Sequence, residues 1–211
     1  MEFHESDEFE HTPWWKGPLG IALALFMIFI FVLTVVPSQS VKVDPQPSYI
    51  PSIAEVYYGQ SLQENFTITD IHDFGSYIST DGEIKRVADN IAVAACEGDR
   101  VCYAKAMFYF VRDNVQYVND PVKFEFAKEP GYTLEVGAGD CDDSSILLSS
   151  LLRSVGIETR FVFIPRHVYV QAKIPEALNR YQDDGWVNMD ATCRDCEFGF
   201  VPYKDVTKTF I

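Results

Sequence analysis

The sequence predicts an α+β fold in which a group of helices precedes an antiparallel sheet, with one transmembrane helix ahead of both. Two observations carry this prediction. Apolar residues recur at helical spacing as far as Val155, whereas from Phe161 onward they gather in short strand-like runs. Helices followed by strands are typical of the α+β class. We therefore expect the helix that contains Ile146 to Val155 to pack across the sheet.

The first predicted element is a membrane helix over residues 19–36. This run is apolar throughout, lies between Pro18 and Pro37, and follows Trp14 and Trp15. As a helix it would reach roughly 27 Å, enough for most of a bilayer core, with the tryptophans in an aromatic belt. A cleaved signal peptide usually has a basic leader and a shorter apolar region, and a buried core helix shows a polar face. The run fits a membrane anchor better than either.

The chain divides into four expected segments. They are an acidic N-terminal tail (1–18), the transmembrane helix (19–36), a proline-rich stalk (37–52) and one domain (53–211). With 47% hydrophobic residues among 211, the domain can bury a proper core. The prolines of the stalk favour an extended, semi-rigid spacer. A formal net charge of −14 argues against nucleic acid and anionic lipid headgroups as partners.

Two helices are predicted over residues 81–97 and 99–117, and Asp120-Pro121 is expected to end the second. Their apolar faces are Ile84, Val87, Ala88 and Ile91 in the first and Val101, Ala104, Phe108, Val111 and Val115 in the second. Residues 56–71 alternate irregularly and are expected to form one or two short strands. The main strands are expected at residues 161–164, 167–172 and 185–190.

The sequence Gly139-Asp140-Cys141-Asp142-Asp143 places a lone cysteine at the start of a helix that Gly156 ends. A thiol in the first turn lies at the positive end of the helix dipole, which lowers its pKa. Buried cysteines are more commonly inert, but this one lies at the helix mouth rather than on the apolar face. The neighbouring aspartates oppose thiolate formation, so an imidazolium would be needed to stabilise it. We interpret the aspartates as helix caps rather than as a calcium loop.

A histidine and an aspartate follow on the predicted strands, in Arg166-His167-Val168 and Met189-Asp190-Ala191-Thr192. Cysteine, histidine and aspartate together are the groups that thiol-based acyl transfer requires. A histidine in a strand can instead be a satisfied polar group, and Asp190 can simply cap a turn. An oxyanion would be bound by the Cys141 backbone N–H and by a second donor, for which Tyr117, Tyr132 and a backbone group are candidates.

These motifs resemble the transglutaminase-like superfamily, whose core is papain-like. The resemblance covers about residues 99–192 and includes Trp-Val-Asn-Met-Asp-Ala-Thr at its end. It implies Cys141 as the nucleophile, His167 as the general base and acid, and Asp190 as the residue that orients the histidine. Triads of this kind need no metal or organic cofactor, so none is implied. Members include peptidases and amidases as well as transglutaminases, and some have lost activity.

The other four cysteines form two local pairs, Cys96 with Cys102 and Cys193 with Cys196. Disulfides, free thiols and a shared zinc site are all open interpretations. Disulfides would suit an oxidising compartment, and Asn65-Phe66-Thr67 is a glycosylation sequon. We therefore expect the domain outside the cytoplasm, although Lys16 and Lys42 balance in the positive-inside count.

We expect a membrane-anchored enzyme that hydrolyses peptide or amide bonds through a thioester, with a peptide or protein as its substrate. Water is favoured over an amine as the acyl acceptor because no amine pocket can be identified. The alternative is a catalytically silent domain that binds a partner complex at the membrane. Retention of all three triad residue types argues against this alternative, and the small size of the domain argues for it.

Overall fold

The computed structural model describes residues 13, 17–40, 44–59, 71–120, 127–200 and 203–211. The side chains of residues 36–40 and 71–73 are not described. The chain divides into two compact units, Met1–Val43 and Asp44–Ile211. The sequon at residues 65–67 and the expected helix stop at Pro121 lie outside the described residues.

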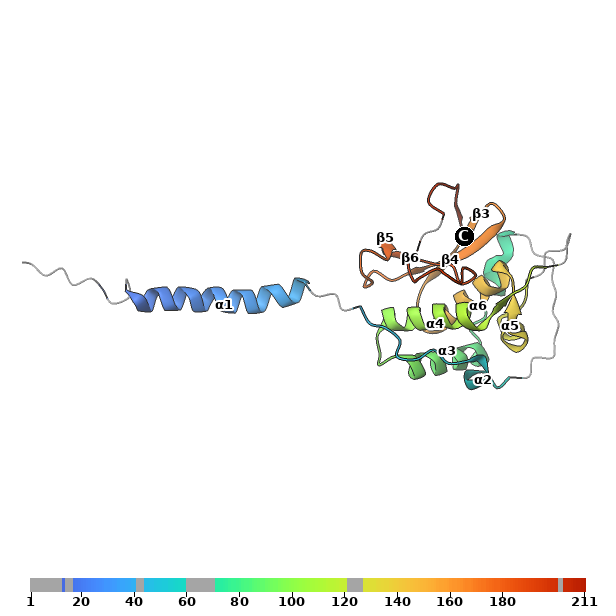
Figure 1. Cartoon of the computed structure of the whole chain (residues 1–211), viewed down its shortest axis with the longest axis horizontal. Coiled ribbons are helices and arrows are strands. Elements are labelled where there is room, and N and C mark those ends of the chain that lie inside the picture. Colours follow the sequence, from blue (N-terminus) through green and yellow to red (C-terminus); the bar gives the residue numbers. More distant parts are fainter. Residues whose placement is uncertain (1–12, 14–16, 41–43, 60–70, 121–126, 201–202) are drawn as a thin grey trace, which may run out of the picture. The chain divides into compact units, whose positions relative to one another are not determined.

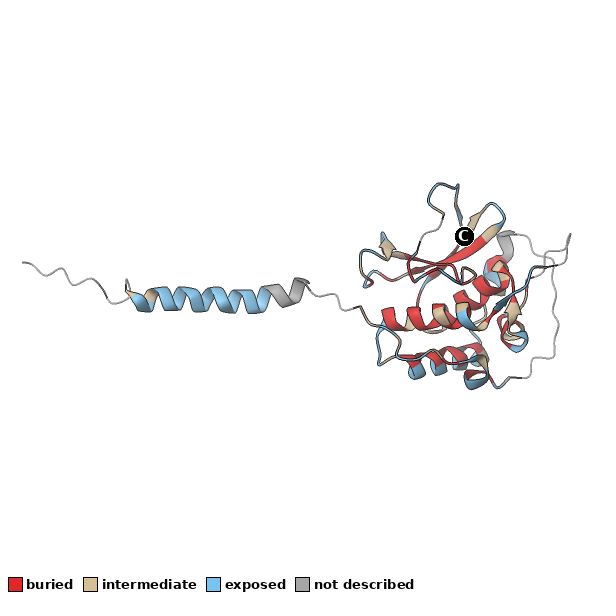
Figure 2. Cartoon of the chain, viewed as in Figure 1, coloured by how far each residue is buried: buried red, intermediate tan, exposed pale blue. Residues whose placement is uncertain are grey.

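The first unit contains helix α1, Pro18–Ser40. Its segment Pro18–Val35 is long and apolar enough to cross a membrane, although a signal sequence would also meet that criterion. Apolar side chains are exposed along this segment (Figure 2), as expected for a helix that contacts lipid. The helix continues beyond the apolar run to Ser40, into the first residues of the expected stalk.

In the part of the chain that the structure describes, the second unit begins with four helices. They are α2 (Ile53–Val56), η2 (Ile71–Tyr77), α3 (Gly82–Ala95) and α4 (Arg100–Asn114). Asp81 caps α3 and Asp99 caps α4, each accepting hydrogen bonds from two backbone N–H groups of the first turn. The two long helices confirm the helical spacing of their apolar residues.

Two boundaries differ from expectation. Helix α4 ends before residue 117 because Gln116–Tyr117 forms strand β1, which pairs in parallel with β2 (Ala138–Gly139). The expected strand start at Val56 is wrong, since Val56 ends helix α2. Residues 57–59 also form no strand, and residue 71 begins η2, whereas residues 60–70 of the predicted region lie outside the described part of the chain.

The sheet has five antiparallel strands in the order β5-β6-β4-β3-β7. Their bounds are β3 (Thr159–Ile164), β4 (His167–Lys173), β5 (Gln182–Asp183), β6 (Trp186–Met189) and β7 (Thr209–Phe210). Strands β3, β4 and β6 confirm the three strands predicted from the sequence. Strand β4 is central, and residues 168–172 are buried.

Helix α6 (Cys141–Ser154) lies between the other helices and this sheet (Figure 1). It contacts α3, α4 and α5 (Pro130–Val136) on one side and strands β3 and β4 on the other. Every residue from Asp143 to Leu152 is buried, and Gly156 follows its end with φ of 77°. The α+β class with a central helix packed on an antiparallel sheet is thus confirmed.

Residues 44–52, expected within a spacer, contact the domain directly. The Asp44 carboxylate accepts a hydrogen bond from the buried Lys105 ammonium at 2.5 Å. Ser48 N–H donates to the carbonyl of Ala95 at 2.9 Å, and the Asn114 amide donates to the carbonyl of Pro51 at 3.1 Å. This part of the chain therefore belongs to the same compact unit as the helices.

The four paired cysteines form two disulfides, Cys96–Cys102 and Cys193–Cys196. The first joins the end of α3 to the first turn of α4, and the second closes a short loop after β6. Disulfides are confirmed, and the free-thiol and zinc interpretations are wrong because each of the four sulfur atoms is already bonded. Cys141 is the remaining cysteine and is free.

Candidate active site

Cys141 is the first residue of α6, and aspartates organise the helix start around it. The Asp140 carboxylate accepts hydrogen bonds from the backbone N–H groups of Asp142 at 3.1 Å and Asp143 at 3.5 Å. In return, the Asp143 carboxylate accepts one from the Asp140 N–H at 3.2 Å. This reciprocal pair is a capping box. The capping interpretation of these aspartates is confirmed.

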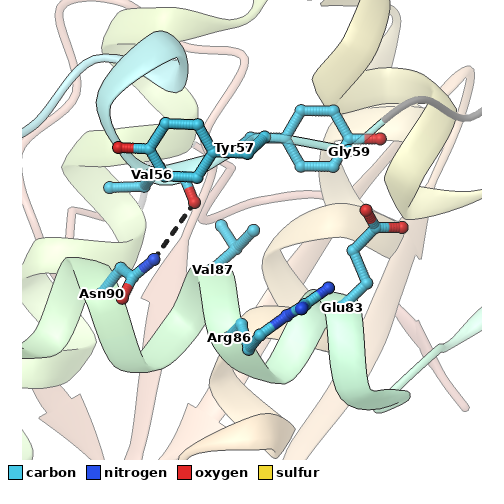
Figure 3. A pocket seen from close by; sticks show the side chains of 8 residues that line it. Val56, Tyr57, Gly59, Glu83, Arg86, Val87 and Asn90 are labelled. Carbon is cyan, nitrogen blue, oxygen red and sulfur yellow. Dashed lines mark hydrogen bonds between the residues drawn. The ribbon is translucent and has the colours of Figure 1, made fainter.

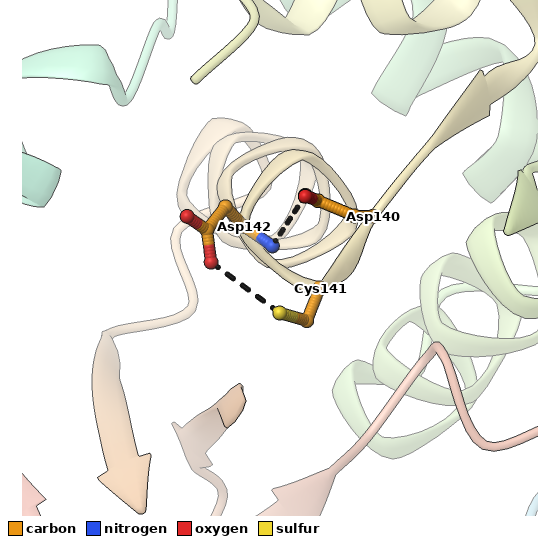
Figure 4. A group of neighbouring side chains, drawn as sticks. All are labelled: Asp140, Cys141 and Asp142. Atoms are coloured by element: carbon orange, nitrogen blue, oxygen red, sulfur yellow. Dashed lines mark hydrogen bonds between the residues drawn. The ribbon is translucent and has the colours of Figure 1, made fainter. Parts of the chain in front are cut away.

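Asp140, Cys141 and Asp142 bring possible ligand atoms within 4.8 Å of one another. The Asp140 carboxylate, however, already serves the cap, and the Cys141 thiol donates to Asp142 Oδ1 at 3.4 Å (Figure 4). Burial, together with the charges of Asp143 and Asp142, raises the pKa of Asp140 to about 7. These interactions account for the cluster without a metal.

Lys128 neutralises Asp143, which is fully buried. Asp143 has no exposed surface and accepts hydrogen bonds from both the backbone N–H and the ammonium of Lys128. Burial alone would lower the pKa of Lys128, but the Asp143 carboxylate outweighs it and raises that pKa. The sequence did not indicate Lys128, because it lies 15 residues before Asp143 and is not part of helix α6.

Gly139 brings the chain close to this first turn of α6. A Cβ atom at this position would lie 2.6 Å from the Cβ of Asp143, closer than side-chain carbons approach one another. Gly139 also pairs with Tyr117 across β1 and β2. Glycine therefore allows β2 to run directly into the capped helix that begins with Cys141.

His167 and Asp190 come together on adjacent strands. His167 begins β4, Asp190 follows β6 directly, and the two strands pair. His167 Nε2 lies 2.8 Å from Asp190 Oδ2, and the aspartate is 97% buried. Burial alone would raise the pKa of Asp190, but the hydrogen bond to His167, the charge of His167 and the hydrogen bonds from Thr192 together outweigh it and lower that pKa. A charged carboxylate is thus held against the imidazole.

The other oxygen of Asp190 caps the turn that follows it. Oδ1 accepts hydrogen bonds from the backbone N–H of Thr192 at 3.2 Å and from its hydroxyl at 2.7 Å. The sequence offered contact with the histidine and turn capping as alternatives. The structure contains both, because each uses a different oxygen of the same carboxylate.

Cys141 contacts strand β4 at Val168, the residue after His167. The Val168 N–H forms a hydrogen bond that by itself lowers the pKa of the thiol, and Ser145 Oγ donates to the Val168 carbonyl at 3.3 Å. Helix α6 is therefore fixed against the start of β4. Within the described residues, no hydrogen bond joins the sulfur to the His167 ring.

The pKa of the Cys141 thiol is shifted in the direction opposite to the one expected from the sequence. Burial, followed by the charge of Asp142, raises the pKa of Cys141 above its ordinary value. The expectation that the helix dipole would lower this pKa was wrong for this arrangement. The dipole acts on the thiol, but burial and a carboxylate 3.4 Å from the sulfur outweigh it.

Tyr203, Tyr169 and Tyr117 lie around the His167–Asp190 pair and Cys141. The hydroxyl of Tyr203 donates to Asp190 Oδ2, and its ring lies beside those of His167 and Tyr169. Tyr117, a candidate oxyanion donor, lies near enough that the charge of Cys141, second to burial, raises its pKa. The other tyrosine candidate, Tyr132, lies half-buried in α5. Sequence reasoning missed Tyr203 and Tyr169, which carry no local motif.

A separate pocket lies between α3 and the segment at the end of α2 (Figure 3). It encloses about 160 Å³ and is lined by residues that include Tyr57, Glu83 and Arg86. Asn90 closes one side by donating to the Val56 carbonyl at 3.3 Å. The pocket is lined by no cysteine or histidine among the described residues, so its side chains are not those of a thiol-based site.

Comparison with known families agrees with this architecture. The family model of the transglutaminase-like superfamily matches residues 85–191. This range contains α6, strand β4 with His167, and strand β6 with Asp190 directly after it. No curated protein matches the chain. Because the match spans half of the 211 residues, the chain belongs to the transglutaminase-like superfamily.

Proposed function

We propose that this protein is a membrane-anchored, thiol-dependent acyl-transfer enzyme that hydrolyses peptide or amide bonds. Cys141 is the nucleophile, His167 the general base and acid, and Asp190 the residue that orients the histidine. The observation that carries the proposal is the 2.8 Å contact between His167 Nε2 and Asp190 Oδ2. It lies on the strand against which the Cys141 helix is packed.

The contact with Asp190 selects the tautomer of His167. A carboxylate only accepts hydrogen bonds, so Nε2 carries a proton and Nδ1 is left with a lone pair for the thiol. His167 then removes the proton from Cys141 as the sulfur attacks the carbonyl carbon of the substrate. Asp190 stabilises the imidazolium that forms.

The negative charge on the carbonyl oxygen requires donors at the helix start. The backbone N–H of Cys141 is one, and the Tyr117 hydroxyl beside the thiol is the second that we propose. As the tetrahedral intermediate collapses, the C–N bond breaks and the imidazolium protonates the departing amine. The acyl group remains on sulfur as a thioester. Water, deprotonated by His167, attacks the thioester, releases the acid and restores the thiol.

The second candidate is a silent domain that binds a partner complex at the membrane. One observation favours it: the thiol donates to Asp142 rather than to His167, and burial keeps its pKa high. For catalysis, the sulfur must exchange Asp142 for the imidazole Nδ1. A domain in which this exchange never occurs would keep the three residue types without activity.

Alkylation of Cys141 separates the two candidates without a known substrate. The other four cysteines are in disulfides, so iodoacetamide under non-reducing conditions reports on Cys141 alone. If His167 activates the thiol, His167→Ala should slow alkylation about 10²-fold, the lower range for general base catalysis. Cys141→Ala controls for labelling elsewhere, and free glutathione calibrates the reagent. Equal rates in wild type and His167→Ala would favour the silent domain.

We also propose that α1 anchors the chain and that the domain lies outside the cytoplasm. Two disulfides within one small domain support an oxidising compartment. Alkaline carbonate should leave the chain in the membrane pellet, and protease added to spheroplasts should digest the domain. A domain that is protected from protease, with all five cysteines alkylated without reductant, would contradict this topology. A cleaved signal sequence would instead give a soluble chain that lacks residues 18–35.

A further inference from the structure

Tyr203 shares an acceptor oxygen with the histidine of the proposed site. Its hydroxyl donates to Asp190 Oδ2 at 3.2 Å, the oxygen that also lies 2.8 Å from His167 Nε2. Thr192 donates twice to the other oxygen. The carboxylate thus has hydrogen-bond partners on both oxygens, and rotation about its Cβ–Cγ bond would disrupt them together.

The Tyr203 ring also limits the movement of the imidazole. Its centroid lies 5.4 Å from that of His167, at an interplanar angle of 58°. Tyr169, two residues after His167 and therefore on the same face of β4, lies 6.3 Å away at 27°. The two tyrosine rings are themselves 5.9 Å apart. The imidazole therefore belongs to a cluster of three rings held by packing.

We propose that Tyr203 is a positioning residue for His167, acting through Asp190. This inference rests on the proposed function. The phenol donates to the carboxylate oxygen that Thr192 does not contact, so that Oδ2 stays aligned with Nε2 of His167. Burial and the charge of Asp190 raise the pKa of Tyr203 to about 12, which keeps the phenol a donor at neutral pH.

Tyr169 offers a matched control. It lies against the same imidazole, but its buried hydroxyl has no hydrogen-bond partner among the described residues. Tyr169→Phe and Tyr203→Phe therefore remove the same atom from two rings of the same cluster. Only the second change removes a hydrogen bond from Asp190, so a general packing effect would appear in both variants.

Two measurements test the proposal. Tyr203→Phe should slow alkylation of Cys141 about tenfold, the size expected from losing one hydrogen bond to a charged group. It should also shift the low-field proton resonance of the imidazole N–H, assigned by its disappearance in His167→Ala. Tyr169→Phe should leave the alkylation rate and the imidazole resonance unchanged. Thermal unfolding should show that all variants are folded.

The resonance reports on the hydrogen bond whether or not the protein is an enzyme. An unchanged resonance in Tyr203→Phe, or an equal shift in Tyr169→Phe, would overturn the positioning role. Equal alkylation of wild type and His167→Ala would instead overturn the proposed function. A shifted resonance in Tyr203→Phe alone would then still support Tyr203 as the residue that positions the pair.

Discussion

Replacing Cys141 with alanine should abolish acyl transfer and leave the domain folded. The sulfur is the atom that attacks the substrate in the proposed mechanism, so its loss should lower turnover about 10⁶-fold, the scale seen when a nucleophile is removed. Stability should change little, because the cap of α6 depends on the carboxylates of Asp140 and Asp143 rather than on the thiol. Alanine is also a good helix former at this position.

The test compares turnover and thermal unfolding for Cys141→Ala on a panel of glutamine and peptide-amide substrates. Ser154→Ala is a suitable control, since it removes a hydroxyl from the other end of the same helix, where it donates to the Ser150 carbonyl at 2.8 Å. This control should keep full turnover. Full activity in Cys141→Ala would end the catalytic interpretation, whereas an unfolded variant would show instead that the thiol stabilises the domain.

Asp190→Asn should lower turnover by about two to four orders of magnitude with a small change in stability. The asparagine oxygen can replace Oδ1 and keep both bonds from Thr192. Its amide then takes the place of Oδ2, where His167 and Tyr203 both need an acceptor. The imidazole responds by adopting the other tautomer, with its proton on Nδ1, so it can no longer accept the proton of the thiol.

Kinetics and thermal unfolding together distinguish orientation from turn capping. Asp195→Asn is the control, because it makes the same chemical change at an exposed position in the Cys193–Cys196 loop. It should alter neither the turnover nor the thermal stability. If Asp190 only capped its turn, Asp190→Asn would keep wild-type turnover, and Asp190→Ala would cost about 1 kcal/mol of stability. That result would remove Asp190 from the proposed triad.

Local patterns predicted the elements that carry the candidate site. Helix α6 follows from helical spacing, an aspartate cap and a stop at Gly156, and all three signals lie within 17 residues. Strands β4 and β6 follow from short apolar runs. The sequence therefore predicted which element carries Cys141, His167 and Asp190. The boundaries at Val56 and after Asn114 differ from expectation. The second depends on pairing between residues 22 positions apart, which no local pattern indicates.

Other features of the site depend on contacts that no local pattern encodes. Lys128 neutralises Asp143 from 15 residues away, and Tyr203 reaches Asp190 from 13 residues away. Asp44 contacts Lys105 across 61 residues, which attaches part of the expected spacer to the domain. Each contact includes a residue outside the helices and strands, so neither helical nor strand periodicity indicates it.

The sequence by itself determined the superfamily, the α+β class and the order of cysteine, histidine and aspartate along the chain. Only the tertiary structure decided among the interpretations of the paired cysteines and showed that Asp190 contacts both His167 and Thr192. It also reversed the expected pKa shift of Cys141. The reason is physical: a pKa depends on burial and on the sum of nearby charges, and both are set only when distant parts of the chain have packed together.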